Sequence, residues 1–411
     1  MKKISFVLVI SLILILMCGC VTQTGQATEI SPIDTQPRTE SVSASDTISE
    51  EYAVQLSPRE EKLSFLCAGD NIVYMGQIRE AAANAKADGN TDAEHDFTPM
   101  YKNVADIIAS YDISFVNQET VMAGEGYDFS AYPSFNSPTE LGENLVSVGF
   151  DIINIATNHM LDMGRQGLSN TIDFWNTQNV LMVGGYTDEE DFYDIRTIQK
   201  NGITIAVGGF TYHPKNVSGT TPYIPTIDDE RITKWITLAK QKSDLVVVSV
   251  HWGYEYRQDP NAEQERLAQL MADAGADVII GHHTHCLQPI EWIEGKGGNK
   301  ALCFYSLGNF TSQTDETVSL PGGFATFDII YNERDGISIE NVGFIPTVMD
   351  YRSSFNKNTV YLLEDYTDEQ CRSHGIVTYF RQTLSVDILR EYVSNAIDEK
   401  YLPQSYLDAE N

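Results

Sequence analysis

Residues 277–285 read Asp-Val-Ile-Ile-Gly-His-His-Thr-His, an apolar run of strand length that ends in a cluster of histidines. Such a short apolar run, followed by glycine and polar residues, is typical of a buried β-strand. Two other stretches share the pattern: residues 63–71 end in Gly-Asp-Asn, and residues 245–253 end in His-Trp-Gly. The chain therefore repeats a strand that finishes in polar, chemically reactive side chains.

Amphipathic segments separate these runs, with apolar residues three and four positions apart and charged residues between them. This alternation predicts an α/β fold. The predicted strands are 63–68, 113–116, 151–156, 203–207, 245–250, 277–280 and 302–307. The predicted helices are 99–111, 138–148, 165–179, 227–242 and 261–274. Open α/β sheets bind ligands at the carboxyl ends of their strands, so the polar residues that follow the strands are the candidate site.

Six strands each deliver Asp, Glu, Asn or His to that edge. The candidates are Asp70, Asn117, Glu119, Asn158, His159, Asp162, His251, Glu255, His282, His283, His285 and Asn309. A single such residue is usually a helix cap or a turn former, but coincidence at six strand ends predicts a metal site. Oxygen and imidazole ligands without thiolates suit Mn, Fe or Zn. We therefore expect one or two divalent metal ions, and two ions would suit hydrolysis.

These motifs, in this order, resemble the CapA family of bacterial capsule (poly-γ-glutamate) synthesis proteins. The motifs are Gly-Asp at 69–70, Asn-x-Glu at 117–119, Asn-His-x-x-Asp-x-Gly at 158–164, His-Trp-Gly-x-Glu-Tyr at 251–256, Gly-His-His-x-His at 281–285 and Ser-Leu-Gly-Asn-Phe at 306–310. The resemblance runs from about residue 62 to residue 345. CapA domains in turn look like calcineurin-type metallophosphoesterases, which implies a metallo-dependent phosphatase-like, four-layer α/β/β/α sandwich.

The resemblance also implies roles for individual residues. The implied metal ligands are Asp70, Glu119, Asn158, His251, His283 and His285, with Glu119 in the place of a bridging aspartate. His159 matches the histidine that contacts the scissile phosphate and protonates the leaving group in phosphoesterases. Those enzymes begin with Asp-x-His, whereas this chain has Ile72 at the histidine position. One metal site therefore lacks an imidazole ligand, and the sequence leaves both turnover and simple binding open.

The remaining candidates are expected to contact substrate or to orient the ligands. They are Asn117, Asp162, Glu255, His282 and Asn309. Each also has an ordinary structural explanation. Glu255 suits an exposed loop, and Gly308-Asn309 suits a turn. Trp252 would either stack on a substrate or pack against the next helix.

The N-terminus carries an export signal. Met1-Lys2-Lys3 precedes an apolar run at 4–17, which is shorter than the roughly 20 residues of a membrane span. The run ends in Leu-Met-Cys-Gly-Cys at 16–20, which resembles the lipobox of bacterial lipoproteins. We expect residues 1–20 to be a lipoprotein signal peptide with Cys20 lipidated; an uncleaved anchor and plain secretion are the alternatives. Residues 21–60 are polar and predict a disordered tether.

The body is predicted to comprise a CapA, metallophosphatase-like domain at 61–350 and a partly helical C-terminal extension at 351–411. Two strand-like runs, 323–331 and 337–347, flank Asn-Glu-Arg-Asp-Gly and predict a β-hairpin that completes the second sheet. The extension contains a helical pattern at 385–397. It either packs on the domain or forms a small appendage.

Charge limits the partners of this protein. Its 411 residues include 58 Asp and Glu but 27 Lys and Arg, a formal net charge of −31. Such a surface repels phosphate backbones and anionic headgroups, so neither nucleic-acid binding nor polybasic membrane docking is expected. Bound cations would be the local positive charge that draws in an anionic ligand.

We therefore expect a lipid-anchored CapA-like protein at the extracytoplasmic face of the cell membrane, acting in poly-γ-glutamate capsule synthesis or export. Its expected partners are an anionic polymer such as poly-γ-glutamate and the membrane subunits of a capsule synthase. The alternative is a metal-dependent, phosphoesterase-like hydrolase of an extracellular anionic substrate. The four cysteines of the body are Cys67, Cys286, Cys303 and Cys371. They form no disulfide framework and are expected to be buried thiols.

Overall fold

The computed structural model describes residues 60–87, 93–212, 214 and 219–409. The predicted signal peptide, Cys20 and nearly all of the tether lie outside these residues. Within the described ranges, no helix combines the length and the apolar character needed to cross a membrane. The four cysteines of the body are buried and free, as expected.

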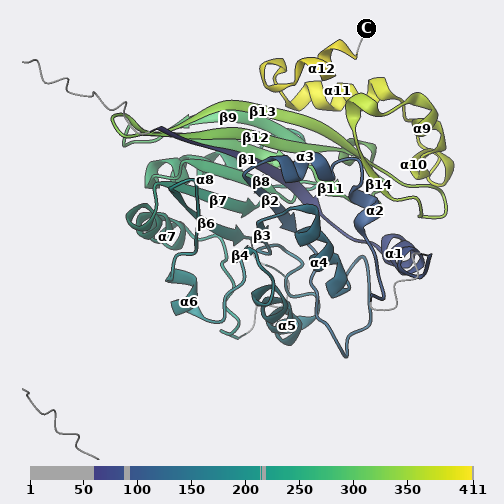
Figure 1. The fold of residues 1–411 in the computed structure, drawn as a ribbon, viewed down its shortest axis with the longest axis horizontal. Helices are drawn as coiled ribbons and strands as arrows, with labels where there is room; N and C mark the ends of the chain where they lie inside the picture. The colour runs from purple at the N-terminus through teal and green to yellow at the C-terminus, as the bar shows by residue number, and fades with distance from the viewer. Residues whose placement is uncertain (1–59, 88–92, 213, 215–218, 410–411) are drawn as a thin grey trace, which may run out of the picture. The chain divides into compact units, whose positions relative to one another are not determined.

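The first β-sheet contains the strand with which the metal-site motifs begin, β1 (Figure 1). Its order is β14-β13-β12-β1-β2-β3-β4, with β11 beside the end of β1. The bounds are β1 (Glu60–Asn71), β2 (Ile113–Gln118), β3 (Ile152–Asn154), β4 (Leu181–Val183), β11 (Asn309–Thr311), β12 (Pro321–Asn332), β13 (Gly336–Asp350) and β14 (Thr359–Leu362). Strands β1 to β4 are parallel, whereas β12, β13 and β14 pair antiparallel.

The second sheet has the order β5-β6-β7-β8-β10-β9. Its strands are β5 (Thr197–Lys200), β6 (Ile203–Thr211), β7 (Leu245–His251), β8 (Val278–His282), β9 (Leu287–Glu294) and β10 (Lys300–Leu307). Its four central strands, β6, β7, β8 and β10, are parallel. The carboxyl ends of these central strands therefore share one edge of the sheet.

Three hydrophobic clusters define the layers. The first joins the facing sides of the two sheets, with Phe65 and Phe115 from one and Val247 and Phe304 from the other. The second packs the first group of helices on the first sheet: α1 (Met75–Ala87), α2 (Thr98–Tyr101), α3 (Ala105–Ser110), α4 (Thr139–Val148) and α5 (Gly164–Asn176). The third packs α6 (Glu189–Tyr193), α7 (Asp229–Lys242) and α8 (Ala262–Ala274) on the second sheet. The predicted α/β/β/α sandwich is therefore confirmed.

Two local predictions need correction. The helix predicted over 99–111 is divided into α2 and α3, and in the break the side chain of Asn103 donates to the backbone oxygen of Val360 in β14, 3.2 Å away. The predicted hairpin forms as β12 and β13, but it does not complete the second sheet. It joins the first sheet instead, because β12 pairs with β1 along nine register positions from Glu60 to Ala68.

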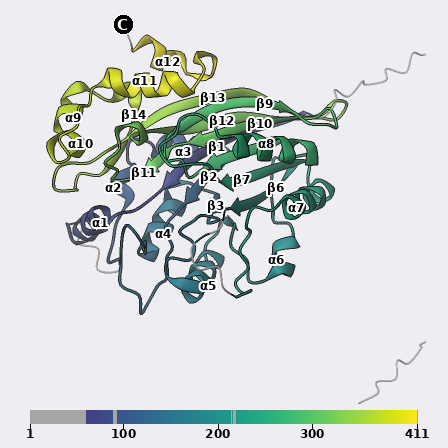
Figure 2. The same ribbon diagram turned by 180° about the vertical axis from the view of Figure 1, so that it is seen from behind.

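The C-terminal extension packs on the domain, which was one of the two arrangements left open. Strand β14 pairs with β13, and Leu389 and Val393 of helix α11 (Val386–Ala396) belong to the cluster between the sheets. Figure 2 shows α11 above β13, on the side of the molecule away from α4 and α5. The remaining elements are three 3-10 turns and four helices: η1 (Thr317–Ser319), η2 (Leu363–Asp365), η3 (Glu399–Tyr401), α9 (Asp368–Ser373), α10 (Gly375–Thr378), α11 (Val386–Ala396) and α12 (Gln404–Asp408).

Candidate metal centre

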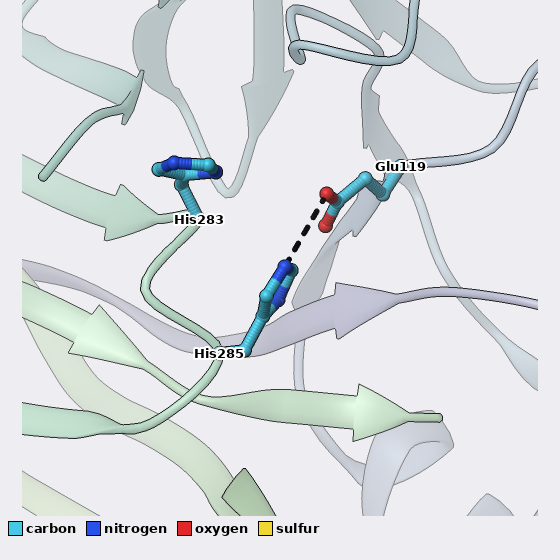
Figure 3. A group of neighbouring side chains, drawn as sticks. All are labelled: Glu119, His283 and His285. Atoms are coloured by element: carbon cyan, nitrogen blue, oxygen red, sulfur yellow. Dashed lines mark ion pairs between the residues drawn. The ribbon is translucent and has the colours of Figure 1, made fainter. Parts of the chain in front are cut away.

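The predicted ligands converge where strand ends of the two sheets meet. Asp70 is near the end of β1, Glu119 follows β2, Asn158 follows β3, His251 ends β7, and His283 and His285 lie in the loop after β8. Two groups each place their ligand atoms within 4.8 Å of one another: Glu119 with His283 and His285, and Asp70 with Glu119 and His251. In Figure 3 the Glu119 carboxylate points towards the imidazole of His285. One buried carboxylate, Glu119, belongs to both groups.

Asp70 is a buried carboxylate that is fully hydrogen-bonded. Its Oδ1 accepts from Asn117 Nδ2 at 2.8 Å, and its Oδ2 accepts from the backbone N–H of His283 at 3.1 Å. His285 Nδ1 lies 3.2 Å from Oδ2, and His282 Nδ1 lies 3.2 Å from Oδ1. Burial acts to raise the pKa of Asp70, but its contacts with His282 and His285 outweigh burial and hold the pKa well below its usual range. Asp70 is therefore an ionised carboxylate.

Glu119 has the opposite environment. It is 1% exposed, and neither carboxylate oxygen has a hydrogen-bond partner among the described residues. Its Oε1 lies 3.7 Å from His251 Nε2, 3.9 Å from His285 Nε2 and 4.0 Å from His159 Nε2, all beyond hydrogen-bond length. Burial raises the pKa of Glu119 well above its usual value. An unpartnered buried carboxylate is costly, which is the condition that a bound cation relieves.

The imidazoles divide into two kinds. Burial, reinforced by neighbouring histidines, lowers the pKa of His251 well below its usual value and the pKa of His283 to about 3. Both rings are therefore neutral, which is the form that binds metals. Burial also acts to lower the pKa of His285, but the charges of Glu119 and Asp70 prevail and raise it to about 9. The two carboxylates thus favour a positive charge on the His285 ring, which would have to lose its proton to bind a metal.

The backbone of the loop after β8 is strained where it presents its imidazoles. His283 has φ 92° and His285 has φ 58°, which are left-handed values that residues other than glycine seldom adopt. Thr284 anchors the loop between them, because its hydroxyl bonds to Ser306 Oγ and to the Cys286 backbone oxygen. Strain of this kind, costing about 1–3 kcal/mol per residue, is concentrated at functional sites.

The donor atoms fit a divalent metal. Unpartnered buried atoms in the described part of the chain include both oxygens of Glu119, Nδ1 of His251 and Nδ1 of His283. Oxygen and imidazole donors without thiolate suit Mn, Fe or Zn. The nearby Cys286 adds no thiolate, since burial raises the pKa of its thiol to about 12. The residues that would hold one or two ions are Asp70, Glu119, Asn158, His251, His283 and His285.

His159 lies at the edge of this centre. Its Nδ1 lies 2.7 Å from Asp162 Oδ2, and Asp162 also accepts from the backbone N–H of Phe135 at 2.7 Å. The Phe135 ring meets the imidazole edge-on, with the two ring centres 4.8 Å apart. Because a carboxylate only accepts, Nδ1 carries a proton and Nε2 faces Glu119. His159 is thus oriented as a proton donor or acceptor towards the centre.

The other predicted residues have distinct places. Asn117 donates to Asp70 and so orients a ligand. His282 is buried against the ring of Phe115, with a distance of 5.9 Å between ring centres. Asn309 is buried and donates to the backbone oxygens of Ser319 and His285, so it supports the histidine loop. Glu255 is exposed and lines the opening of the centre.

Trp252 packs rather than stacking on a substrate. Its side chain is buried in the cluster between the second sheet and the helices, and its indole nitrogen donates to the backbone oxygen of Tyr305 at 2.9 Å. Of the two explanations that the sequence allowed for Trp252, the structure supports packing.

Sequence reasoning missed two residues of the site. Asn154 donates to Asn117 Oδ1 at 2.7 Å and so extends the chain of amides that ends on Asp70. Its signal was a carboxamide within the apolar run 151–156, since a buried polar residue needs a partner. Tyr212 lies with its ring centre 4.7 Å from that of His283 and stacks on His251. In the sequence, only the position of Tyr212 directly after β6 indicates that it lies beside these histidines.

Comparison with solved structures finds distant similarity. The NAD nucleotidase NadN of Haemophilus influenzae aligns with 82% of this chain and 60% of its own, at 12% identity and a TM-score of 0.42. At that level the similarity supports no statement about activity. The architecture therefore rests on the sheets and clusters described above.

Comparison by sequence finds close relatives. The PGA biosynthesis protein CapA of Bacillus subtilis (strain 168) is 42% identical over 174 residues, which are 40% of this chain and 43% of that protein. The capsule biosynthesis protein CapA of Bacillus anthracis is 38% identical over 172 residues, 39% of this chain and 40% of that one. Each alignment thus spans less than half of the relative. The profile of the bacterial capsule synthesis protein family PGA_cap matches residues 64–314, and the chain belongs to that family.

Proposed function

We propose that this protein is a metal-dependent component of poly-γ-glutamate capsule synthesis or export, held at the extracytoplasmic face of the cell membrane by lipidated Cys20. Family membership supports the pathway, since two relatives are named for PGA or capsule biosynthesis. The observation that carries the role of the site is the unpartnered, buried Glu119 carboxylate among three imidazoles. The membrane subunits of a capsule synthase are the proposed protein partners, and no nucleic-acid partner is proposed.

The proposed ligand is an anionic group of the polymer. With a net charge of −31, the chain as a whole repels a polycarboxylate. Divalent cations held by Asp70, Glu119 and the three ligand histidines would bind and polarise a carboxyl or phosphoryl oxygen. The hydrogen bonds from Asn117 and the His283 backbone keep Asp70 in place to receive them.

Metal content and capsule display together test this proposal. The His283→Ala variant should lose most of its bound divalent metal, whereas His95→Ala should retain it, because His95 pairs with Glu140 outside the site. A strain whose only copy carries His283→Ala should lose surface poly-γ-glutamate, as a deletion strain should. Normal capsule display in either strain would contradict the proposed role.

A second candidate function is hydrolysis, which the His159–Asp162 pair favours. In this reaction the oxygen of a water molecule would bond to the phosphorus of a phosphoester or to the carbonyl carbon of a polyglutamate amide. His159 Nε2 would accept the proton that the attacking water loses, the bond to the leaving group would break, and Nε2 would pass that proton to the departing oxygen or nitrogen. Asp162 would hold the imidazole in the required orientation.

Turnover assays separate the two candidates. If the protein is a hydrolase, His159→Gln should lower turnover by about 10²–10⁴-fold while metal content stays at the wild-type level. Asp162→Asn should cause a smaller loss, since it removes only the orienting carboxylate. Lack of turnover by the metal-loaded wild type on both phosphoesters and polyglutamate would exclude this candidate and leave the binding role.

A further inference from the structure

Two hollows beside the candidate metal centre share one lining residue, Glu255. The larger, of about 560 Å³, includes Tyr212, Tyr254 and His283 in its lining. The smaller, of about 40 Å³, includes Tyr132, Tyr256, His159 and His285. Glu255 lines both hollows and is exposed. We call Glu255 and the four exposed tyrosines the mouth of the site; the tyrosines are Tyr132, Tyr212, Tyr254 and Tyr256.

The two hollows beside the mouth are lined by carboxylates but by no basic lysine or arginine side chain. No lysine or arginine occurs among the residues that line either hollow. The larger hollow has two carboxylates, and that of Glu263 is paired with Arg266 at 2.8 Å. Glu255 has no ion pair and no hydrogen bond in the part of the chain that the structure describes. Its carboxylate is therefore unpaired, and its charge also helps to raise the pKa of His285 at the candidate metal centre.

The loop that carries Glu255 is fixed on both sides. Gly253 has φ 89°, and a β-carbon there would lie 2.7 Å from Gln264 Oε1, so only glycine fits. The backbone N–H of Tyr256 donates to the Thr284 oxygen at 2.7 Å, in the loop that bears the histidine ligands. The His283 ring also lines the larger hollow, and its Nδ1 is buried without a partner. Glu255 thus has a defined position relative to the centre.

We propose that the mouth binds the ammonium group of a ligand whose carboxylate binds at the metal centre. A carboxylate attracts organic cations through charge pairing, and tyrosine rings that line the same hollows can add cation–π attraction. The ligand class is an amino acid with a free amine. This inference rests on the proposed function, in which the ligand is a glutamate polymer.

Under that function the mouth distinguishes the amino-terminal residue of the polymer from its interior. An interior repeat presents a carboxylate beside an uncharged amide nitrogen, and Glu255 repels its further carboxylates. The terminal residue presents a carboxylate beside an ammonium, which matches the metal centre and Glu255 together. The site would therefore bind chain ends and free glutamate in preference to the middle of a chain.

Calorimetric titration of the Mn²⁺-loaded full chain tests the proposal with three probes: L-glutamate, glutarate, which lacks only the amine, and N-acetyl-L-glutamate, which mimics the interior. The wild type should bind glutamate roughly five- to tenfold more tightly than the other two. Glu255→Gln should reduce that ratio to about one, and Glu255→Lys should invert it in favour of glutarate. The matched control, Glu263→Gln, should keep the wild-type ratio, because Glu263 is already paired with Arg266.

Two results would overturn the inference. Equal binding of glutamate and glutarate by the wild type, or a preference that survives in Glu255→Gln, would show that the mouth does not recognise an amine, while the metal centre would still bind carboxylates. If metal-loaded protein bound none of the probes, the glutamate ligand of the proposed function would fail as well, and the inference with it. Because Glu255 is exposed, its replacement should leave folding intact, which circular dichroism would verify.

Discussion

Two neighbouring buried carboxylates of the candidate site, Asp70 and Glu119, have opposite hydrogen-bonding environments. Asp70 is stabilised as an anion by Asn117 and by its histidine neighbours, whereas Glu119 has no hydrogen-bond partner in the described residues. Their pKa values shift in opposite directions for that reason. The contrast explains why Glu119 is the better candidate for a ligand shared by two metal ions.

Replacing Asn117 tests the support of Asp70. Asn117→Ala removes the 2.8 Å hydrogen bond to Asp70 Oδ1 and also leaves the Asn154 amide without its acceptor. Loss of such an outer hydrogen bond should weaken Mn²⁺ binding by about 10–100-fold, measured by calorimetry. Asn136→Ala is the matched control, since Asn136 is an equally buried carboxamide that bonds to Ala123 and Asp128 instead. If the Asn117→Ala and Asn136→Ala variants bound Mn²⁺ with equal affinity, Asn117 would not be a support of Asp70.

At this scale the sequence predicted the candidate ligands that the structure brings together, but it missed two residues that contact them. Asp70 and His251 can be recognised from the sequence because they come at the carboxyl ends of predicted strands, where α/β sheets bind their ligands. Asn154 lies inside the predicted strand 151–156, so the sequence did not mark it as a strand end, and Tyr212 contacts the rings of two histidines that are distant in sequence. Only the folded chain brings such pairs together.

Among the described elements, α10 should have a stability that depends on pH, because a buried histidine caps its first turn. His374 begins this helix: its Nδ1 accepts from the Ile376 N–H at 3.0 Å, and its Nε2 lies 3.1 Å from the Met349 oxygen in β13. The ring is therefore neutral, with both nitrogens occupied. Burial lowers the pKa of His374 from 6.5 to about 4.

This pKa sets the direction of the pH dependence. Because the folded-state pKa is depressed, the stabilising contribution of His374 is fully present above pH 6.5 and is lost as the pH falls towards 4. The loss should amount to about 3 kcal/mol in the free energy of unfolding, measured by urea denaturation at several pH values. His374→Asn keeps an acceptor for the Ile376 N–H but does not titrate, so its profile should be flatter over this range. Parallel profiles would contradict the assignment.

The elements also show which features local sequence patterns do not predict. Apolar runs and turn residues predicted most central strands and the β12–β13 hairpin, because these signals are local. The pattern over 99–111 looked like one helix, yet a side-chain contact between Asn103 and the distant strand β14 accompanies its division. The sheet that the hairpin joins was likewise mispredicted, since pairing with β1 depends on residues more than 200 positions away.

At the scale of the whole molecule, the C-terminal extension is part of the folded domain. Leu389 of α11 is fully buried among residues of the cluster between the sheets. Leu389→Ala should therefore lower the free energy of unfolding by about 2–5 kcal/mol. Glu391→Ala, on the exposed side of the same helix, should change it by less than about 0.5 kcal/mol. Equal stability of the two variants, measured by chemical denaturation, would mean that α11 is a loose appendage.

The net negative charge of the molecule makes the candidate metal centre the main means by which it could bind an anionic ligand. A chain with a net charge of −31 has little means of attracting an anionic ligand except through cations that it binds. The overall fold and family followed from the order of motifs along the sequence, and the family profile and the two sheets confirm them. The negative charge of the mouth could not be predicted from the sequence, because it depends on which side chains the fold places beside Glu255.

The most direct test of the central claim is the metal content of the purified chain, measured by mass spectrometry after incubation with Mn²⁺ and removal of free ions. The wild type should retain one or two divalent ions per chain, and Glu119→Gln, which removes the shared carboxylate at nearly constant size, should retain far less. The wild type should also unfold at a higher temperature with metal than without it. A metal-free wild type, or a Glu119→Gln variant with the same metal content as the wild type, would contradict the account.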